Sequence, residues 1–380
     1  MKITLERTPE QVELIKAMAS KNRDVAYEAQ TALAEFIGPV LAEVVNAAPT
    51  VSNMFNSLQF NSDESPSIPL DLYHDITDED YIQVWSQSVP GGLPTNQVAP
   101  SQSELKFTTY TLDSALSFDK RYASRSRLDV VSKTFTRMAQ EILLKQEKTS
   151  ATMIMTALAN ATTNTEKHVI RSAQANRFLL SDLNKLFTKA KRINAAWTGG
   201  TPAERRGRGI TDLLVSPEIV EEIRGLAYNP INTKGPDGEE PTASGPGIAG
   251  TDTMRDAIFN SAGIPEFYGV SIQEYNEMGD GQKWNTVFDT AAGETKFDAH
   301  YVTGGEAAVF NGTSEQILVG VDLSRESMIR AVATDSESGD EFSLVADDQF
   351  VTRQSKIGYY GSLEEGRMII DDRVLMGLIV

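Results

Sequence analysis

Residues Ser126–Ala161 read SRLDVVSKTFTRMAQEILLKQEKTSATMIMTALANA, and this stretch decides the fold. Apolar side chains recur along it at helical spacing, and neither glycine nor proline interrupts it. The apolar positions on this face are Val131, Phe135, Met138, Ile142, Ile154 and Leu158. The pattern predicts one helix of about 52 Å at 1.5 Å per residue, far longer than the globular average of about 11 residues. Ser126 and Asp129 are the expected capping pair at its start.

Ahead of this helix, the sequence predicts a helical arm. Thr8 is the expected capping residue, Pro9 takes the first helical position, and Gln11 is the capping-box residue. A second helical stretch begins at Val25 and is expected to bend or end at Gly38-Pro39. We assign residues 1–70 to this arm.

Residues 71–120 are expected to form a long extended loop. WSQSVPGGLPTNQVAPSQ, Trp85–Gln102, contains three prolines, two glycines and no charge, a composition that is also typical of a linker. The following Leu105–Phe118 alternates as a strand does, with Leu105, Phe107, Thr109 and Thr111 expected on one face. Because long ordered excursions usually have an interaction role, we prefer an excursion that ends in a β-arm.

The second half of the chain predicts an α/β unit and then strands. A helix capped by Ser181 is expected over Ser181–Ile193, and ITDLLVSPEIVEEIRGLA, Ile210–Ala227, predicts a strand, a Ser216 cap with Pro217 behind it, and a helix. The further expected elements are a helix over Thr253–Ser261, a strand over Phe267–Tyr275, strands over Glu306–Phe310 and Gln316–Val321 joined by an Asn311-Gly312 turn, and strands over Ser327–Thr334, Phe342–Val345 and Phe350–Gly358. The closing stretch GRMIIDDRVLMGLIV, Gly366–Val380, ends in an apolar strand that needs a partner to stay ordered.

Composition narrows the function classes. The chain has 380 residues, a formal net charge of −18 and no cysteine, which excludes disulfides, thiolate metal sites and cysteine nucleophiles. Its 40% hydrophobic and 23% charged residues are those of a folded protein. Most of so acidic a surface repels nucleic acid, so direct DNA binding is disfavoured as the main activity. With no secretory signal and no apolar run of about 20 residues, we expect a soluble cytoplasmic product.

The charge is unevenly distributed along the chain. Lys185–Arg208 holds seven basic residues and one acid, whereas Asp335–Asp348 holds six acids and no base. Solvated faces explain most runs of this kind, and patches of opposite sign on different lobes could also meet between identical subunits.

No catalytic, cofactor or metal site is predicted. GPGIAG, Gly245–Gly250, matches a phosphate-binding pattern, but no strand precedes it, so we interpret it as a surface loop. His74, His168 and His300 stand alone without metal-ligand spacing. The adjacent carboxylates Asp371-Asp372 and Glu221-Glu222 point different ways in regular structure, so we interpret them as ordinary solvated acids. We therefore expect no cofactor and no enzyme activity.

The order of these elements resembles the Hong Kong 97-type (HK97) major capsid protein of tailed double-stranded-DNA bacteriophages. Arg121–Ala161 resembles the spine helix of that family, Ile210–Leu226 a segment of its axial lobe, and Gly366–Val380 its terminal peripheral-lobe strand. The resemblance implies an α+β fold whose parts are an N-terminal arm (1–70), an extended loop (71–120), a peripheral domain with a spine helix at 127–161 (121–209), an axial domain (210–325) and peripheral β-strands (326–380). It also implies that the closing strand pairs within the peripheral sheet, near the spine helix.

The function implied by this resemblance is structural. Hexamers and pentamers would form the icosahedral shell of a virion, assembled in the host cytoplasm, around packaged double-stranded DNA that is not bound sequence-specifically. Because many members carry a cleaved scaffolding segment and this chain begins at Met1, a separate scaffolding protein is expected, with a portal and a decoration protein as further partners and no membrane. An acidic inner wall would limit adhesion of the DNA. The residues expected at subunit interfaces are Trp85, Leu93, Val98, Leu105, Phe107, Tyr110, Arg205, Arg206 and Arg208.

Two alternatives remain open at this stage. A cellular encapsulin-like nanocompartment would have the same fold but would enclose enzymes, and neighbouring genes for a portal and a terminase would favour the virus instead. A cytosolic hydrolase that uses paired carboxylates on the α/β lobe is the alternative of another class. It predicts a small oligomer and a loss of activity when one acid becomes its amide.

Overall fold

The computed structural model of the chain describes residues 8–46, 48, 50–69, 104–163, 166–172, 176–194, 209–225, 269–293, 309–324, 327–335, 341–347 and 355–380. The chain divides into two compact units. Unit 1 comprises Met1–Pro69, Ser103–Ala151 and Met328–Met368, and unit 2 comprises Leu70–Gln102, Thr152–Ser327 and Ile369–Val380.

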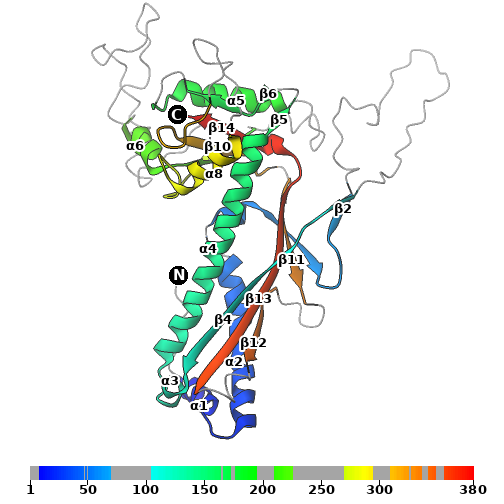
Figure 1. Ribbon diagram of the computed structural model, residues 1–380, viewed down its shortest axis with the longest axis vertical. Coiled ribbons are helices and arrows are strands. Elements are labelled where there is room, and N and C mark those ends of the chain that lie inside the picture. Colours follow the sequence, from blue (N-terminus) through cyan, green and yellow to red (C-terminus); the bar gives the residue numbers. More distant parts are fainter. Residues whose placement is uncertain are drawn as a thin grey trace, which may run out of the picture. The chain divides into compact units, whose positions relative to one another are not determined.

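The predicted long helix is confirmed. Helix α4 runs from Leu128 to Asn160 without a break (Figure 1). Its predicted cap is wrong, because Ser126 has a positive φ of 51° and its hydroxyl has no hydrogen-bond partner in the part of the chain that the structure describes. The uninterrupted apolar face, rather than a capping side chain, therefore defines this helix.

The two amino-terminal helices form as predicted at their start. Helix α1 spans Pro9–Met18, and the hydroxyl of Thr8 accepts the backbone N–H of Gln11 at 3.3 Å. Helix α2 spans Arg23–Asn46 and continues through Pro39, so the break expected there is wrong. Ile37 and Leu41, on either side of the proline, are each only 1% exposed. Burial of this continuous apolar face offsets the backbone hydrogen bond that proline removes.

These helices do not form a detached arm. Their apolar faces belong to the main core of unit 1, which they share with α4 and with the strands of the unit 1 sheet. The core members from α1 and α2 are Ile15, Met18, Ala29, Leu33, Ala34, Ile37, Leu41 and Val45. The apolar stripe that predicted the helices is thus the face that packs against the rest of unit 1.

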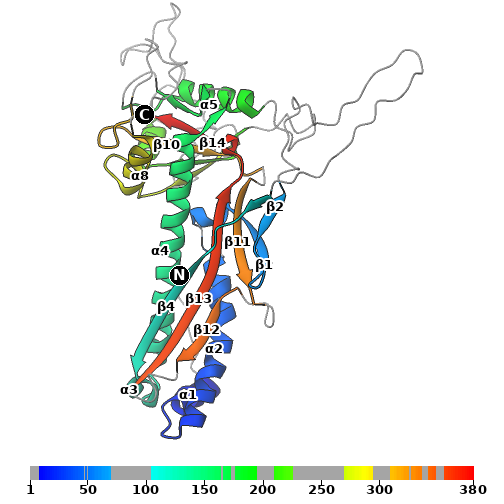
Figure 2. The same ribbon diagram turned by 45° about the vertical axis from the view of Figure 1, so that its right-hand side comes forward.

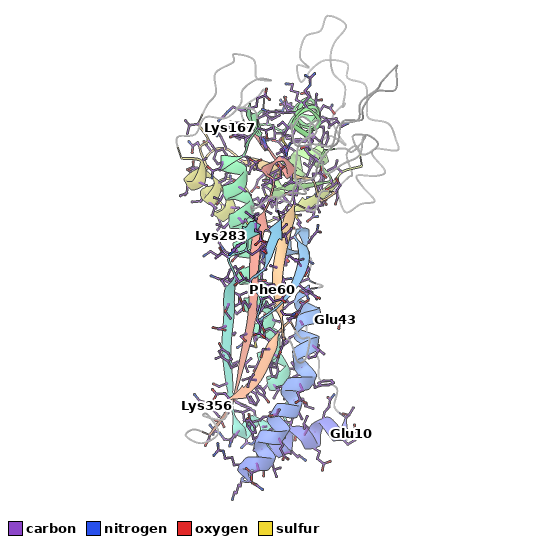
Figure 3. The ribbon with its side chains drawn as sticks, turned by 90° about the vertical axis from the view of Figure 1, so that its right-hand side faces the viewer. Glu10, Glu43, Phe60, Lys167, Lys283 and Lys356 are labelled. Carbon is purple, nitrogen blue, oxygen red and sulfur yellow. The ribbon has the colours of Figure 1, made fainter. Side chains whose placement is uncertain are left out.

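The unit 1 sheet has five strands, which lie beside α2 and α4 (Figures 1 and 2). Its strands are β1 (Asn56–Asn61), β11 (Met328–Thr334), β13 (Lys356–Ile369), β12 (Ser343–Asp347) and β4 (Tyr110–Asp119). β1 pairs in parallel with β11, and Phe60 is its one buried side chain (Figure 3). β4 pairs antiparallel with β13 over ten residues, from Tyr110 opposite Glu365 to Asp119 opposite Lys356.

Strand β4 alternates as predicted but with the opposite face inward. Leu112, Leu116 and Phe118 pack against the core, whereas Thr111 is exposed. Residues 107–109 lie outside the strands, so they shift the phase of the alternation between Leu105 and β4. The strand itself is therefore confirmed, and its assigned face is corrected.

Unit 2 is built on a second five-stranded sheet, in the order β7-β14-β10-β8-β9. The strands are β7 (Val169–Arg171), β14 (Leu375–Ile379), β10 (Ile317–Val321), β8 (Asp212–Val215) and β9 (Ser271–Glu274), and the helices of the unit are α5 (Leu180–Ile193), α6 (Pro217–Gly225) and α8 (Lys283–Ala292). Residues of α5, α6 and all five of these strands form one core. The strand–Ser–Pro–helix prediction is confirmed, since the Ser216 hydroxyl accepts the N–H of Ile219 at 3.3 Å.

The closing strand pairs with β7, a strand of the predicted peripheral domain, as expected, and also with β10 of the predicted axial domain. β14 lies between β10, to which it is antiparallel, and β7, to which it is parallel, and all five of its residues are buried. The stretch 326–380 is therefore divided, with β11, β12 and β13 in the unit 1 sheet and β14 in the unit 2 sheet. An all-apolar strand requires a sheet that is covered on both faces, and the interior position between β7 and β10 in unit 2 supplies it.

The remaining expectations have mixed outcomes. Helix α5 begins at Leu180 after an N-cap at Leu179, so Ser181 does not cap it. A turn forms at Asn311, whose side chain accepts the N–H of Thr313 at 3.1 Å, but it does not close the expected hairpin, because β10 pairs on its two sides with β14 and β8. Helix α8 was not predicted. The loop Gly245–Gly250 and the helix expected over Thr253–Ser261 lie outside the described residues.

Candidate functional site

The candidate site is the base of the predicted extended loop. Two short strands, β2 (Ser67–Pro69) and β3 (Glu104–Lys106), form an antiparallel ladder in which Ile68 lies opposite Leu105. The N–H of Phe107 continues the ladder by donating to the carbonyl of Pro66 at 3.0 Å. Backbone pairing therefore holds residues 69 and 104 together, on either side of the segment 70–103.

Three residues expected at a subunit interface lie at this base. Leu105 is half-buried, whereas Phe107 is only 6% exposed within its own chain, which leaves little of its surface to another subunit. Tyr110, the first residue of β4, is half-buried, and its hydroxyl donates to Glu365 at 2.9 Å. Phe107 and Tyr110 thus contribute to the anchoring of the loop within the chain.

Glu365 on β13 is the centre of a buried polar network in unit 1. Its side chain is 0% exposed, and one carboxylate oxygen accepts from Arg330 Nε at 3.0 Å and from Gln146 Nε2 at 2.9 Å. The other oxygen accepts from the hydroxyl of Tyr110 and from Arg367. Strands β4, β11 and β13 and helix α4 are therefore joined at one carboxylate.

The two arginines extend the network to the amino-terminal part of unit 1. Arg367, whose side chain is also 0% exposed, donates to the hydroxyl of Ser52 at 2.7 Å in the 3-10 helix η1 (Val51–Met54). Arg330 donates to Asn46 Oδ1, at the end of α2, at 3.1 Å. The network therefore connects the base of the loop to α2 and η1 as well as to the sheet.

Two positive charges and one negative charge are buried together here. Burial alone would raise the pKa of Glu365, but the charges of Arg367 and Arg330 and the hydrogen bonds that they donate outweigh it and hold this pKa below its ordinary value. Burial raises the pKa of Tyr110 to about 12, with Arg367 opposing that shift and Glu365 adding to it. The carboxylate is thus ionised and the phenol neutral, as their hydrogen bonds require.

This arrangement is suited to positioning rather than to reaction. Both carboxylate oxygens of Glu365 accept hydrogen bonds from donors of the chain itself. The carboxylate is therefore held by these partners and not presented to a substrate. Removal of one partner from a buried ion pair typically costs about 3–5 kcal/mol, which makes such a network a strong lock on its geometry. We therefore assign it the task of fixing the base of the extended loop.

The sequence pattern does not indicate this network. Arg330 lies in the predicted strand Ser327–Thr334 and Arg367 in the closing stretch Gly366–Val380, whereas Glu365 falls between predicted strands. A charge at such positions normally marks a solvated face. The one available signal is that Arg330 interrupts the apolar run MIRAVA, in which its neighbours on both sides are buried. The other residues expected at interfaces, Trp85, Leu93, Val98, Arg205, Arg206 and Arg208, lie outside the described residues.

A second buried polar group stabilises the closing strand of unit 2. His168 is 0% exposed, and its Nδ1 lies 3.1 Å from the carbonyl oxygen of Leu375 and 3.2 Å from that of Asp372. Carbonyls only accept, so Nδ1 carries the proton and Nε2 accepts from the hydroxyl of Thr163 at 2.8 Å. Burial lowers the pKa of His168. Both ring nitrogens are engaged, so this histidine is not available as a metal ligand.

The adjacent carboxylates have separate partners. Asp371 pairs with Arg373, whereas Asp372 accepts the N–H of Thr162 at 3.0 Å. Glu222 accepts the N–H of Phe178 at 2.5 Å. In the part of the chain that the structure describes, no group of three or more histidine or acidic side chains is placed to hold a metal ion. None of the helices among these residues has the length and apolar character that a membrane crossing requires.

Solved structures of capsid proteins have a similar fold. The protein of the mature capsid of bacteriophage PhiM1 is 8% identical, the alignment covers 87% of this chain and 86% of that chain, and the TM-score is 0.50. The capsid of cyanophage P-SCSP1u is 12% identical over 86% of each chain, with a TM-score of 0.45. The SrpI encapsulin of Synechococcus elongatus is 10% identical over 89% of this chain and 93% of that chain, with a TM-score of 0.44.

The likeness to the PhiM1 protein shows a shared α+β fold with a long helix. At this level of identity it identifies the fold alone. No protein-family model matches the chain, and no curated protein matches its sequence.

Proposed function

We propose, from the premise that this chain has the HK97-type capsid fold, that it is the major capsid protein of a tailed bacteriophage. Many copies assemble as hexamers and pentamers into the icosahedral shell of the virion, which encloses packaged double-stranded DNA. The observation that carries this proposal is the common fold over 87% of the chain with the mature PhiM1 capsid protein. The role is structural and requires no catalytic turnover.

The site geometry supports this function. A segment that reaches another subunit transmits its load to its own subunit through its base, so the base must be rigid. The β2–β3 ladder and the ten-residue pairing of β4 with β13 supply that rigidity, and the network at Glu365 fixes the point where they meet α4. Residues 71–120 are in this proposal the extended loop, and Trp85, Leu93, Val98 and Leu105 contact a neighbouring copy.

The domain assignment is part of the same proposal. Unit 1 corresponds to the peripheral domain and residues 210–325 to the axial domain. Residues 369–380 join the axial sheet, because β14 pairs with β10. Arg205, Arg206 and Arg208, just ahead of the axial domain, are proposed as further subunit contacts. A separate scaffolding protein and a portal complete the expected set of partners.

Electron microscopy of the purified full-length chain, with and without the candidate scaffolding protein, tests the proposal. Closed shells or capsomers are expected. Monomers or dimers that never assemble would overturn it. Nuclease-protected DNA inside shells from infected cells is expected for a phage capsid, whereas protein cargo without DNA would identify an encapsulin-like compartment.

The contact role of the loop has its own test. Trp85→Ala is expected to reduce assembly without changing the thermal stability of the unassembled chain, because the side chain would be buried only against another copy. Trp284→Ala is the contrasting variant, since Trp284 is buried within its own chain and its loss should lower that stability. Undiminished assembly of the Trp85 variant would remove this residue from the interface.

A further inference from the structure

One face of unit 1 is basic in an otherwise acidic protein. Helix α3 (Lys120–Ser124) and the part of α4 that belongs to unit 1 together span residues 120–151. This stretch holds eight basic and three acidic residues, although the whole chain has a net charge of −18. The basic residues are Lys120, Arg121, Arg125, Arg127, Lys133, Arg137, Lys145 and Lys148.

The basic residues of α4 project from a single face. Lys133, Arg137 and Lys145 are exposed, and at 100° per residue they fall within about 120° of the helix circumference, a sector that also holds the exposed Glu141. From Lys133 to Lys145 they extend about 18 Å along the axis at 1.5 Å per residue. Within the part of the chain that the structure describes, none of the three forms an ion pair. We call Lys133, Arg137 and Lys145 the α4 stripe.

The chemistry of the α4 stripe suits a polyanion better than a protein partner. Lysine is depleted at the cores of protein interfaces, which select large apolar and aromatic side chains. The one large apolar side chain exposed on this face is Leu144, at 57%. Long, flexible basic side chains at intervals of one to two helical turns can instead follow a regular array of phosphates without reading bases.

Six acidic side chains of unit 1 lie on two other helices. α1 and α2 carry Glu10, Glu13, Asp24, Glu28, Glu35 and Glu43. Figure 3 shows Glu10 and Glu43 projecting from these helices on the same side of unit 1. The opposed charges give unit 1 a face that attracts DNA and another that repels it.

We propose that the α4 stripe contacts the phosphates of packaged duplex DNA, so that this face of α4 looks into the shell. The inference rests on the proposed function. It implies that the inner wall of the shell is not uniformly acidic but carries rows of basic side chains. Each duplex strand presents a phosphate about every 3.4 Å, so an 18 Å stripe passes about five phosphates of one strand. Contacts of this kind are sequence-independent and weaken with salt, which permits DNA to move during packaging.

The test measures binding of the unassembled full-length chain to a fluorescent 60-base-pair duplex of arbitrary sequence at several salt concentrations. The stripe variant combines Lys133→Gln, Arg137→Gln and Lys145→Gln. The control variant combines Lys16→Gln, Lys21→Gln and Lys283→Gln, which remove the same charge at exposed positions outside α4. Because all six side chains are exposed, thermal unfolding should be unchanged in both variants.

The stripe variant should lose about 2.7 from the slope of log Kd against log salt concentration, and the control variant should lose almost none. Equal slopes for wild type and stripe variant, or equal losses in both variants, would overturn the inference. So would failure of the stripe variant alone to assemble, because the α4 stripe would then be a contact with another copy.

A density map of DNA-filled shells adds an independent readout. The α4 stripe should face the lumen, and a stripe on the outer surface would overturn the inference while leaving the capsid function intact. If the wild type never assembles, the proposed function fails, but the comparison of salt slopes on the unassembled chain still decides the inference.

Discussion

Replacement of Glu365 by glutamine should destabilise unit 1 strongly. The substitution keeps the shape of the side chain but leaves the guanidinium groups of Arg330 and Arg367 buried without a counter-charge. It also places an amide NH₂ where one carboxylate oxygen now accepts from Arg330 and Gln146, so donors would face donors. Loss of one partner of a buried ion pair costs about 3–5 kcal/mol.

Thermal and urea unfolding of the unassembled protein measure this loss. About 3–5 kcal/mol corresponds to a fall in Tm of roughly 6–20 °C for a unit of this size. The matched control is Glu364→Gln, because Glu364 is half-buried, is adjacent in sequence and has a side chain that makes no hydrogen bond among the described residues. A loss below about 1 kcal/mol for Glu365→Gln, or an equal loss for the control, would refute the reasoning.

The charge balance of the site adds a second comparison. Arg330→Met leaves one guanidinium facing one carboxylate, so it should cost less than Glu365→Gln, which leaves two cations and no anion. The contribution of Glu365 to the free energy of unfolding depends on pH with a definite sign. Because the pKa of Glu365 is lowered from 4.5 in the folded chain, this contribution is fully present above pH 4.5 and is lost as the pH falls further. The difference between wild type and Glu365→Gln should therefore narrow below pH 4.5.

Four further substitutions test the core, the histidine and a helix cap by urea unfolding. Gly361→Ala should destabilise the protein by about 1–3 kcal/mol, because an added Cβ would lie 2.6 Å from Phe342 Cζ. In Gly38→Ala the added Cβ meets nothing within 3.7 Å, so this substitution should stabilise α2 by about 0.5–1 kcal/mol. Stability changes of the same sign in both variants would contradict this expectation. Since the pKa of His168 is lowered from 6.5 on folding, unit 2 should lose stability as the pH falls below 6.5. His168→Gln should abolish that pH dependence. An unchanged dependence of stability on pH in this variant would contradict the prediction. Ser216→Ala should cost about 1 kcal/mol through loss of the cap, and a neutral result would show that the cap contributes nothing.

The local part of the fold could be predicted because it depends on short-range chemistry. The caps at Thr8 and Ser216 and the uninterrupted face of α4 each lie within one segment, so the sequence pattern alone indicates them. Pro39 was misjudged for the converse reason. Its effect on α2 depends on tertiary burial of Ile37 and Leu41, which the segment itself does not reveal.

The long-range part could not be predicted. Strand pairing is selected by partners far away in sequence, so the apolar character of β14 indicated burial but not which sheet would bury it. Glu365 illustrates the same limit for the site. A charge in an alternating strand indicates a solvated face unless its counter-charges are known, and these come from Arg330 on another strand and Arg367 two residues later.

The position of β14 between β7 and β10 has a consequence for the timing of folding during synthesis. Gly377 pairs with Val169, so the polypeptide between them must have left the ribosome before this row of the sheet can close. Until then β7 and β10 have no strand between them, and the backbone groups that β14 will pair have no partner in this sheet. A nascent chain cut short by premature termination ahead of Leu375 would never complete this sheet, which would keep defective copies out of any assembly that requires a folded subunit.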